Sequence, residues 1–261
     1  MTERFHDEVR VTVDDGCAHL VMEQGEGANT FTPVKVDAMT DALRAAEAAD
    51  CVLLRGEGQF SVGADLQTFG AASPAERTDL VRETVAASNR FIRAVRETDR
   101  LVVAGIEGAA AGGGLGFALA CDLLVMAEDA VLDTAYARIG LTPDNGTPYF
   151  LARALGPYRA RELLFDPEPV SGAEAQDLGL VATVIADSEG AFVEGAAAFA
   201  RRHARLPAGA RGMTKALVDS AFEEGLDAHL ERQRERVVAA SRTDGFAEGL
   251  AAFLAHREPD W

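Results

Sequence analysis

The 261-residue sequence predicts an α/β protein, with a β/α core over residues 1–195 and a helical region over residues 196–261. In the first half, short apolar runs of strand length alternate with segments of helical periodicity. In the second half, helical periodicity dominates. No internal repeat, low-complexity segment or clear linker separates the halves, so we expect one core with a helical appendage.

The strands and helices of the first half follow from local signals. An Asp-Asp-Gly turn joins residues 9–13 and 18–22, which alternate as in a β-hairpin. The Thr-Pro pair at residues 32–33 opens a helix that runs to about residue 49. Residues 73–76 form a capping box, Ser-Pro-Ala-Glu, which starts a long helix. We also expect strands at 51–54, 101–106, 123–126 and 130–132, and a helix at 112–121.

The second half contains one further strand signal, at residues 181–185. A second capping box, Ser171 with Glu174, starts one of its helices. We expect helices at 147–155, 158–165, 171–178, 188–204, 209–223, 227–240 and 244–256.

The charge of the chain excludes some classes of partner. It has 42 acidic and 25 basic residues and a formal net charge of −17, and Lys35 and Lys215 are its only lysines. A field of this sign repels polyanions, so we expect neither nucleic acid nor a membrane surface as a partner. Because the acids are spread along the chain, they indicate a solvated surface. This composition would also suit a high-salt cytoplasm.

Cysteine usage and hydropathy favour a cytoplasmic location. Cys17, Cys51 and Cys121 lie far apart and form no disulfide framework or CxxC pair. The charged N-terminus does not resemble a signal peptide. The longest weakly charged stretch, residues 101–121, contains Glu107 and six glycines. It is therefore expected to form a buried strand, a glycine turn and a buried helix rather than a membrane span.

Two glycine-rich turns, Phe60–Leu66 and Gly108–Gly116, are the most informative local features. Each follows a buried strand, and glycine lets the backbone approach a ligand closely. Two unpaired backbone N–H groups aimed at one carbonyl oxygen would make an oxyanion hole. The alternative is that both are close-packing turns in an α/β core. The catalytic and nucleotide-binding motifs HExxH, GxSxG and GxGxxG are absent. The five histidines are scattered along the sequence, so no histidine metal site is expected.

These turns carry a family resemblance. Residues 60–66 resemble the F-x-x-G-A-D-[LI] motif of the crotonase superfamily, the enoyl-CoA hydratases and isomerases. Residues 108–122 resemble its second motif, G-x-x-x-G-G-G followed by an apolar helix and Cys-Asp. Similar segments continue in order along nearly the whole chain, at residues 139–143, 155–156, 171–175, 179–181 and 246–253.

The resemblance implies a crotonase-like spiral β/α core, a helical C-terminal trimerisation region and an acyl-CoA thioester ligand. It also implies that the backbone N–H groups of Ala64 and Gly113 hold the thioester oxygen in an oxyanion hole. A homotrimer or a dimer of trimers is the implied assembly.

Two departures from the family pattern bear on the reaction. Family hydratases carry a glutamate just after the Gly-Gly-Gly and a second one further on, and these positions are Gly116 and Tyr136 here. Hydration needs one group to activate water and another to protonate the α-carbon. The sequence therefore does not predict an efficient enoyl-CoA hydratase.

Asp144 is the candidate catalytic residue. Family isomerases, including some dienoyl-CoA and ring-epoxide phenylacetyl-CoA isomerases, have an aspartate in a similar Pro-Asp-x-Gly context. The alternative is that Asp144 caps the helix starting near Thr147. Asp133 is a second candidate, whereas Asp65 and Asp122 are expected to bond backbone N–H groups.

A related dehalogenase also has this aspartate, as a nucleophile, but needs a histidine on the preceding long helix. The corresponding helix here contains none, which argues against dehalogenation.

The expected activity is an acyl-CoA isomerase that shifts a double bond through an enolate, from 3-enoyl-CoA to 2-enoyl-CoA or in a related ring-epoxide acyl-CoA. Tyr136, Leu141 and Gly116 are expected to line the substrate pocket. No cofactor is expected, because coenzyme A is part of the substrate. Alternatives are an enoyl-CoA hydratase or other crotonase-type thioester chemistry, a catalytically silent acyl-CoA-binding trimer, and a protein without CoA affinity.

Overall fold

The computed structural model describes residues 2–23, 28–186 and 190–261. The chain forms two compact units. Unit 1 comprises Met1–Glu97 and Val102–Arg201, and unit 2 comprises Thr98–Leu101 and Arg202–Trp261. The division falls six residues beyond the expected boundary at 195/196, because Ala196, Ala197 and Ala200 are fully buried in α7, the last helix of the core.

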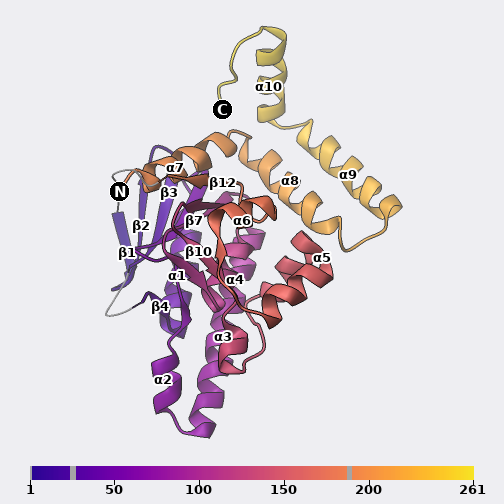
Figure 1. Cartoon of the computed structure of the whole chain (residues 1–261). Coiled ribbons are helices and arrows are strands. Elements are labelled where there is room, and N and C mark those ends of the chain that lie inside the picture. Colours follow the sequence, from indigo (N-terminus) through magenta and orange to yellow (C-terminus); the bar gives the residue numbers. More distant parts are fainter. Residues whose placement is uncertain (1, 24–27, 187–189) are drawn as a thin grey trace. The chain divides into compact units, whose positions relative to one another are not determined.

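A seven-stranded sheet with strand order β1-β2-β3-β5-β7-β9-β12 forms the centre of unit 1 (Figure 1). The expected hairpin is confirmed, because β2 and β3 pair antiparallel with Val9 opposite Met22. β3 and β5 pair parallel, as do β7 with β9 and β9 with β12. The bounds are β1 Thr2–His6, β2 Val9–Asp14, β3 Cys17–Met22, β5 Cys51–Gly56, β7 Leu101–Ile106, β9 Leu123–Ala127 and β12 Thr183–Ile185.

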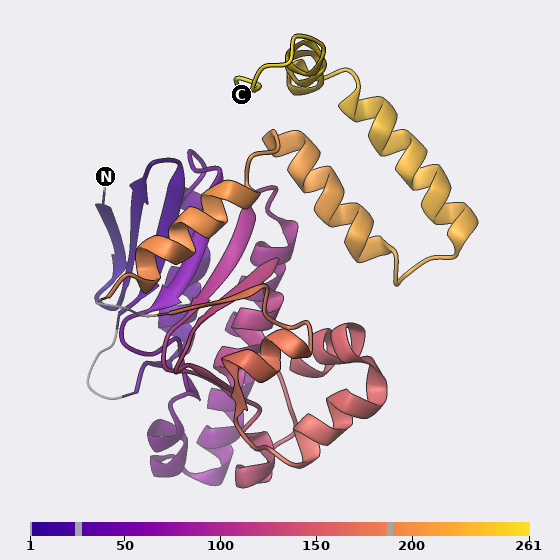
Figure 2. The ribbon, with the colours of Figure 1, turned by 45° about the horizontal axis from the view of Figure 1, so that its top comes forward.

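Helices pack on this sheet and complete the core of unit 1. Helix α1 contacts the first three strands. Helix α7 lies over the sheet (Figure 2), where Phe192 and Ala196 approach Gly105 of β7. The helices are α1 Pro33–Ala45, α2 Leu66–Ala71, α3 Pro74–Glu97, α4 Gly113–Ala120, the 3₁₀ helix η1 Tyr136–Ile139, α5 Thr147–Phe165, α6 Gly172–Asp177 and α7 Phe192–His203.

The sequence signals for helix starts are confirmed by side-chain hydrogen bonds. The Thr32 side chain accepts from the Lys35 N–H at the start of α1. Ser73 and Glu76 bond each other's backbone N–H groups before α3, as a capping box does. The expected break near residue 156 is a kink inside one helix, α5, where Gly156 has a φ of 75°.

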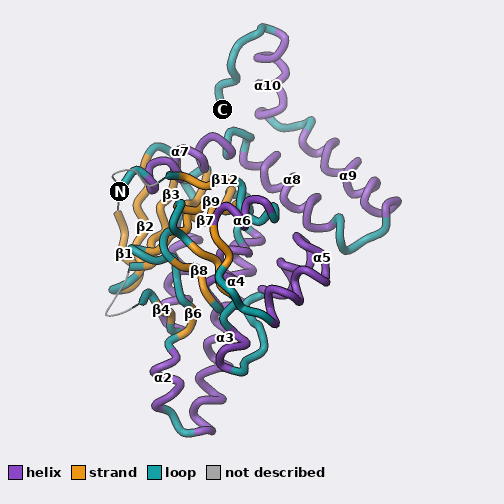
Figure 3. Tube along the Cα trace, in the orientation of Figure 1, coloured by secondary structure: helices purple, strands orange, loops and turns teal. Residues whose placement is uncertain are grey.

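Two small sheets place the glycine-rich turns, and neither was expected as a sheet. β4 (Thr30–Phe31) pairs with β6 (Gly63–Ala64), apart from the main sheet (Figure 3). β8 (Ala109–Ala111), β10 (Val131–Asp133) and β11 (Val170–Ser171) form the other. All five of these strands span two or three residues, too few for an alternating pattern to be recognised, and only β10 matches an expected strand, the apolar run at 130–132.

Unit 2 is helical, as expected, with α8 (Ala208–Ser220), α9 (Leu226–Ala240) and α10 (Asp244–Leu254) following one another (Figure 2). The buried Arg211 guanidinium donates to the carbonyl oxygens of Asp99, Ala204 and Leu206. Thr243 caps α10. No helix among the described residues is long and apolar enough to cross a membrane.

Candidate active site

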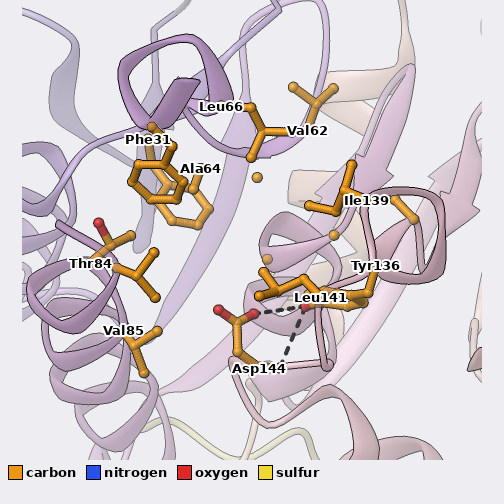
Figure 4. A pocket seen from close by; sticks show the side chains of 16 residues that line it. Phe31, Val62, Ala64, Leu66, Thr84, Val85, Tyr136, Ile139, Leu141 and Asp144 are labelled. Carbon is orange, nitrogen blue, oxygen red and sulfur yellow. Dashed lines mark hydrogen bonds between the residues drawn. The ribbon is translucent and has the colours of Figure 1, made fainter. Parts of the chain in front are cut away.

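An apolar cavity of about 100 Å³ lies in unit 1, beside both glycine-rich turns (Figure 4). Among its lining residues, the polar side chains are Thr84, Tyr136 and Asp144. Thr84 donates its hydroxyl to the Leu80 carbonyl, four residues back in its own helix. The lining residues are Phe31, Val62, Gly63, Ala64, Leu66, Phe69, Val81, Thr84, Val85, Gly112, Gly113, Ala135, Tyr136, Ile139, Leu141 and Asp144.

Backbone pairing brings the two glycine-rich turns together. The Ser61 N–H donates to Ala109 O at 3.1 Å, and the Ala111 N–H donates back to Ser61 O at 2.8 Å. The Phe60 N–H similarly donates to Glu107 O at 2.9 Å. This short parallel bridge fixes the end of one turn against the start of the other, and both continue into the cavity wall.

Gly63 is required where the turns meet. Its φ is +99°, and a Cβ on it would lie 3.1 Å from Gly113 N and 3.3 Å from Ala111 O. A side chain there would be strained and would push the turns apart. Ala64 and Gly113, the two predicted oxyanion-hole donors, therefore line the same cavity. Gly113 is the first residue of α4, whose leading N–H groups have no partner within the helix.

The Asp144 side chain points into the cavity, across from Val85 (Figure 4). The Tyr136 hydroxyl donates to Asp144 Oδ1 at 2.9 Å and lies 3.2 Å from the Thr147 hydroxyl. Burial raises the pKa of Asp144 above that of a free aspartate, and the Tyr136 hydrogen bond partly opposes the rise. The pKa of Tyr136 is raised by burial and by the nearby carboxylate, so its hydroxyl remains a proton donor.

The helix-cap alternative for Asp144 is wrong. Helix α5 is capped by Gly146, without a side-chain cap hydrogen bond. The Thr147 N–H bonds the backbone carbonyl of Asp144 at 2.9 Å, not its carboxyl group. The carboxylate is thus left to face the cavity and Tyr136.

The other aspartates are engaged elsewhere. Asp133 accepts from the Ala135 N–H at 2.9 Å, pairs with Arg138 at 2.5 Å, and does not line the cavity described above. Asp65 accepts from the N–H groups that begin α2, and Asp122 accepts from the Val102 N–H at 2.8 Å. Asp65 and Asp122 therefore bond backbone N–H groups, as predicted.

We expected Gly116 to line the substrate pocket, but it is not one of the described residues that line the cavity. It lies in the fully buried helix α4, where a Cβ would be 2.5 Å from both Cβ and O of Asn145. The backbone next to Asp144 thus fills the space that a side chain at position 116 would need. Tyr136 and Leu141 line the cavity as expected.

Part of the wall was not identified from the sequence. Val81, Thr84 and Val85 line the cavity from α3, and Phe31 lines it from β4 (Figure 4). The helical periodicity of α3 marks an apolar face, but periodicity cannot distinguish a face that meets the core from one that borders a cavity. Thr84 lies on that face with its hydroxyl bonded to its own helix.

Metal ligands and redox pairs do not define this site. No group of three or more His, Cys, Asp or Glu side chains suited to a metal occurs among the residues that the structure describes. Cys17, Cys51 and Cys121 are buried, and no disulfide joins them among the described residues. The polar groups of the described lining are therefore one carboxylate, one phenol, the Thr84 hydroxyl and backbone N–H groups.

The sequence and the fold match a known family. The model of the enoyl-CoA hydratase/isomerase family matches residues 12–261. The chain therefore belongs to that family, within the crotonase superfamily, and its mixed α/β fold is that of the family's solved structures.

Several relatives are similar over nearly their full length. The chain is 29% identical over 253 residues to the 1,2-epoxyphenylacetyl-CoA isomerase of Escherichia coli (strain K12), covering 95% of this chain and 96% of that one. It is 31% identical over 250 residues to 4-chlorobenzoyl coenzyme A dehalogenase-1 of Arthrobacter sp, covering 90% of each. An enoyl-CoA hydratase structure from Polaromonas sp. JS666 superposes with a TM-score of 0.89 at 32% identity, covering 97% of this chain and 98% of that one.

Family membership supports an enzyme with crotonase-type thioester chemistry. The names of the relatives include a hydratase, an isomerase and a dehalogenase. The reaction must therefore be argued from the residues of this site.

Proposed function

We propose that this protein is an acyl-CoA isomerase that moves a double bond from the 3- to the 2-position of an enoyl-CoA, with Asp144 as the base. The observation that carries the proposal is that Asp144 is the only carboxylate lining the cavity among the described residues. Its burial raises its pKa, which makes it a stronger base once ionised.

In this mechanism the N–H groups of Ala64 and Gly113 donate to the thioester oxygen. They stabilise the negative charge that develops there when Asp144 removes a proton from C2. The enolate then takes the same proton back at C4, which leaves the double bond between C2 and C3. Each donor contributes about 3 kcal/mol of transition-state stabilisation in comparable oxyanion holes.

Tyr136 orients the base. Its hydroxyl donates to one carboxylate oxygen of Asp144, so the other oxygen is available to the substrate. Most side chains that line the cavity are apolar and offer no second group to activate water, which favours proton return to carbon over hydration. A single carboxylate can perform both proton transfers in turn.

The competing reactions need groups that the described lining does not contain. Hydration calls for a second acid–base group, and the two family glutamate positions are Gly116 and Tyr136. The dehalogenase of this superfamily uses a histidine on the helix that corresponds to α3, which has none. Isomerisation of a ring-epoxide acyl-CoA needs the same enolate stabilisation, and the name of the Escherichia coli relative supports testing it.

We also propose a homotrimer or a dimer of trimers, with coenzyme A entering only as part of the substrate, and a cytoplasmic location. Unit 2 exposes large apolar side chains, which in a soluble chain favour burial against another subunit. These exposed apolar side chains of unit 2 include Leu226, Leu230, Val237, Phe246 and Phe253, at 50–76% exposure. Analytical ultracentrifugation distinguishes a trimer or hexamer from a monomer.

The decisive experiment compares wild-type protein with Asp144→Asn on 3-enoyl-, 2-enoyl- and epoxyphenylacetyl-CoA. Asparagine keeps the shape and accepts from Tyr136, but it cannot take a proton. We expect loss of isomerisation by about 100-fold or more, with acyl-CoA binding by calorimetry retained. Isomerisation that persists within a few fold shows that Asp144 is not the base, and binding without turnover by wild type supports a silent acyl-CoA-binding protein.

A further inference from the structure

We propose that Lys35 and Asn29 are positioning residues that hold the Ala64 arm of the oxyanion hole in place. This inference rests on the proposed function, because it assumes that the Ala64 N–H binds the thioester oxygen. Neither residue lines the described cavity. They would act through a continuous path of buried hydrogen bonds that ends beside Ala64.

Lys35 is the first part of this path. It is 1% exposed, an unusual location for one of only two lysines in the chain. A buried ammonium group is costly unless it is surrounded by acceptors. Burial lowers the pKa of Lys35, and the Glu8 carboxylate opposes that shift. Its Nζ lies 3.0 Å from Glu23 O, 3.0 Å from Asn29 Oδ1, 3.2 Å from Thr30 O and 3.1 Å from Glu8 Oε2.

Asn29 is the second part and connects two segments that are distant in the sequence. It is 3% exposed and has a φ of 50°, a left-handed conformation that asparagine tolerates better than most residues. Its Nδ2 donates to Met22 O at 3.2 Å, Gln59 O at 2.8 Å and Phe60 O at 2.9 Å. The amide thus fastens the end of β3 to the segment that leads to Ala64.

Ser61 completes the path. Its hydroxyl donates to the Asn29 carbonyl at 3.0 Å and accepts from the Gly63 N–H at 3.3 Å. The path therefore runs from Lys35 through Asn29 and Ser61 to the residue that precedes Ala64. All three side chains are buried, so water cannot replace a lost partner without entering the core.

Removing the Lys35 ammonium takes this donor away from four acceptors, among them the buried Asn29 side-chain carbonyl. As a result, we expect the backbone of residues 60–66 to open more often to solvent. A displacement of about 1 Å in a positioned group costs about 100-fold in rate. Substrate binding depends on the whole cavity and on the CoA portion, so kcat should fall much more than KM rises.

The test is Lys35→Met, with Lys215→Met as the matched control. Lys215 lies in unit 2, where it donates to the Arg100 carbonyl. For Lys35→Met we expect kcat for 3-enoyl-CoA isomerisation to fall about 10- to 100-fold and KM to change by less than about threefold. Backbone hydrogen exchange should quicken in residues 60–66 but not in residues 113–120. Lys215→Met should match wild type in all these measurements.

Ser61→Ala is a milder variant that keeps the test decisive if Lys35→Met does not fold. It removes only the last hydroxyl of the path, so we expect the same pattern with a smaller loss of kcat. Unchanged exchange in residues 60–66 in the folded variants overturns the positioning role. If wild-type protein turns over no enoyl-CoA, the proposed reaction fails, whereas the exchange measurement still decides whether this path orders the Ala64 segment.

Discussion

A side chain at position 116 is expected to disable the enzyme instead of converting it into a hydratase. An ideal Cβ on Gly116 would lie 2.5 Å from both Cβ and O of Asn145. Non-bonded carbon atoms pack at about 3.5–4.0 Å, so one partner must move by about 1 Å or more. Gly116 lies inside a fully buried helix, so the displacement falls on Asn145.

Displacement of Asn145 would disturb both halves of the site. Its Nδ2 donates to Gly113 O at 3.1 Å, and its backbone is continuous with Asp144. A shift of about 1 Å predicts a loss of kcat of about 100-fold in Gly116→Ala. Overpacking of this kind costs about 1–3 kcal/mol of folding free energy.

The assay is enoyl-CoA isomerisation, followed by the absorbance of the conjugated product, together with urea unfolding. Gly209→Ala in α8 is the control, because the nearest atom to its added Cβ is Met213 Cε at 3.9 Å. There we expect unchanged turnover and, as is usual for glycine to alanine in a helix, a gain of about 0.5–1 kcal/mol. If Gly116→Ala keeps turnover and stability near those of wild type, the packing argument is refuted. Efficient hydration of 2-enoyl-CoA by Gly116→Glu would refute it as well.

Two further predictions concern the protonation of Asp144. Tyr136→Phe removes a hydrogen bond that lowers the Asp144 pKa. The acidic limb of the pH profile of kcat/KM should therefore move to higher pH. A limb that does not move contradicts the proposed role of Tyr136. Asp144 has a folded-state pKa above its unfolded value of 3.8, so its ionisation destabilises the fold as pH rises through that window. Asp144→Asn should therefore gain stability over wild type above this window and lose the advantage below it, and a pH-independent difference in unfolding free energy argues against a buried carboxylate.

The fold was largely predictable because its elements carry local signals. The capping boxes, the hairpin turn and the apolar strand runs each lie within a few residues, whereas the order of the strands in the main sheet was not predicted. The small sheets were not predictable, because β4 and β6 are two residues long and pair across a long interval of sequence. No local pattern in Thr30–Phe31 indicates its partner.

The position of three candidate residues at one cavity was predictable from the sequence, whereas their chemical roles stay predictions. Ala64, Gly113 and Asp144 line one cavity, as proposed from motif resemblance. The error at Gly116 arose because its neighbour, Asn145, is brought to it by tertiary packing. Sequence position alone cannot distinguish a glycine that opens a pocket from one that admits another backbone segment.

The two departures from the hydratase pattern are structurally linked. At one glutamate position, Gly116 leaves the space that Asn145 fills. At the other, Tyr136 donates its hydroxyl to Asp144. Both positions therefore support the same segment, residues 144–145, which carries the proposed base. A glutamate at 116 would displace that segment, and a glutamate at 136 would put a second carboxylate beside Asp144, where like charges disfavour ionisation. Restoring either glutamate alone therefore works against the base that this chain has, so conversion to a hydratase requires rebuilding residues 144–145 as well.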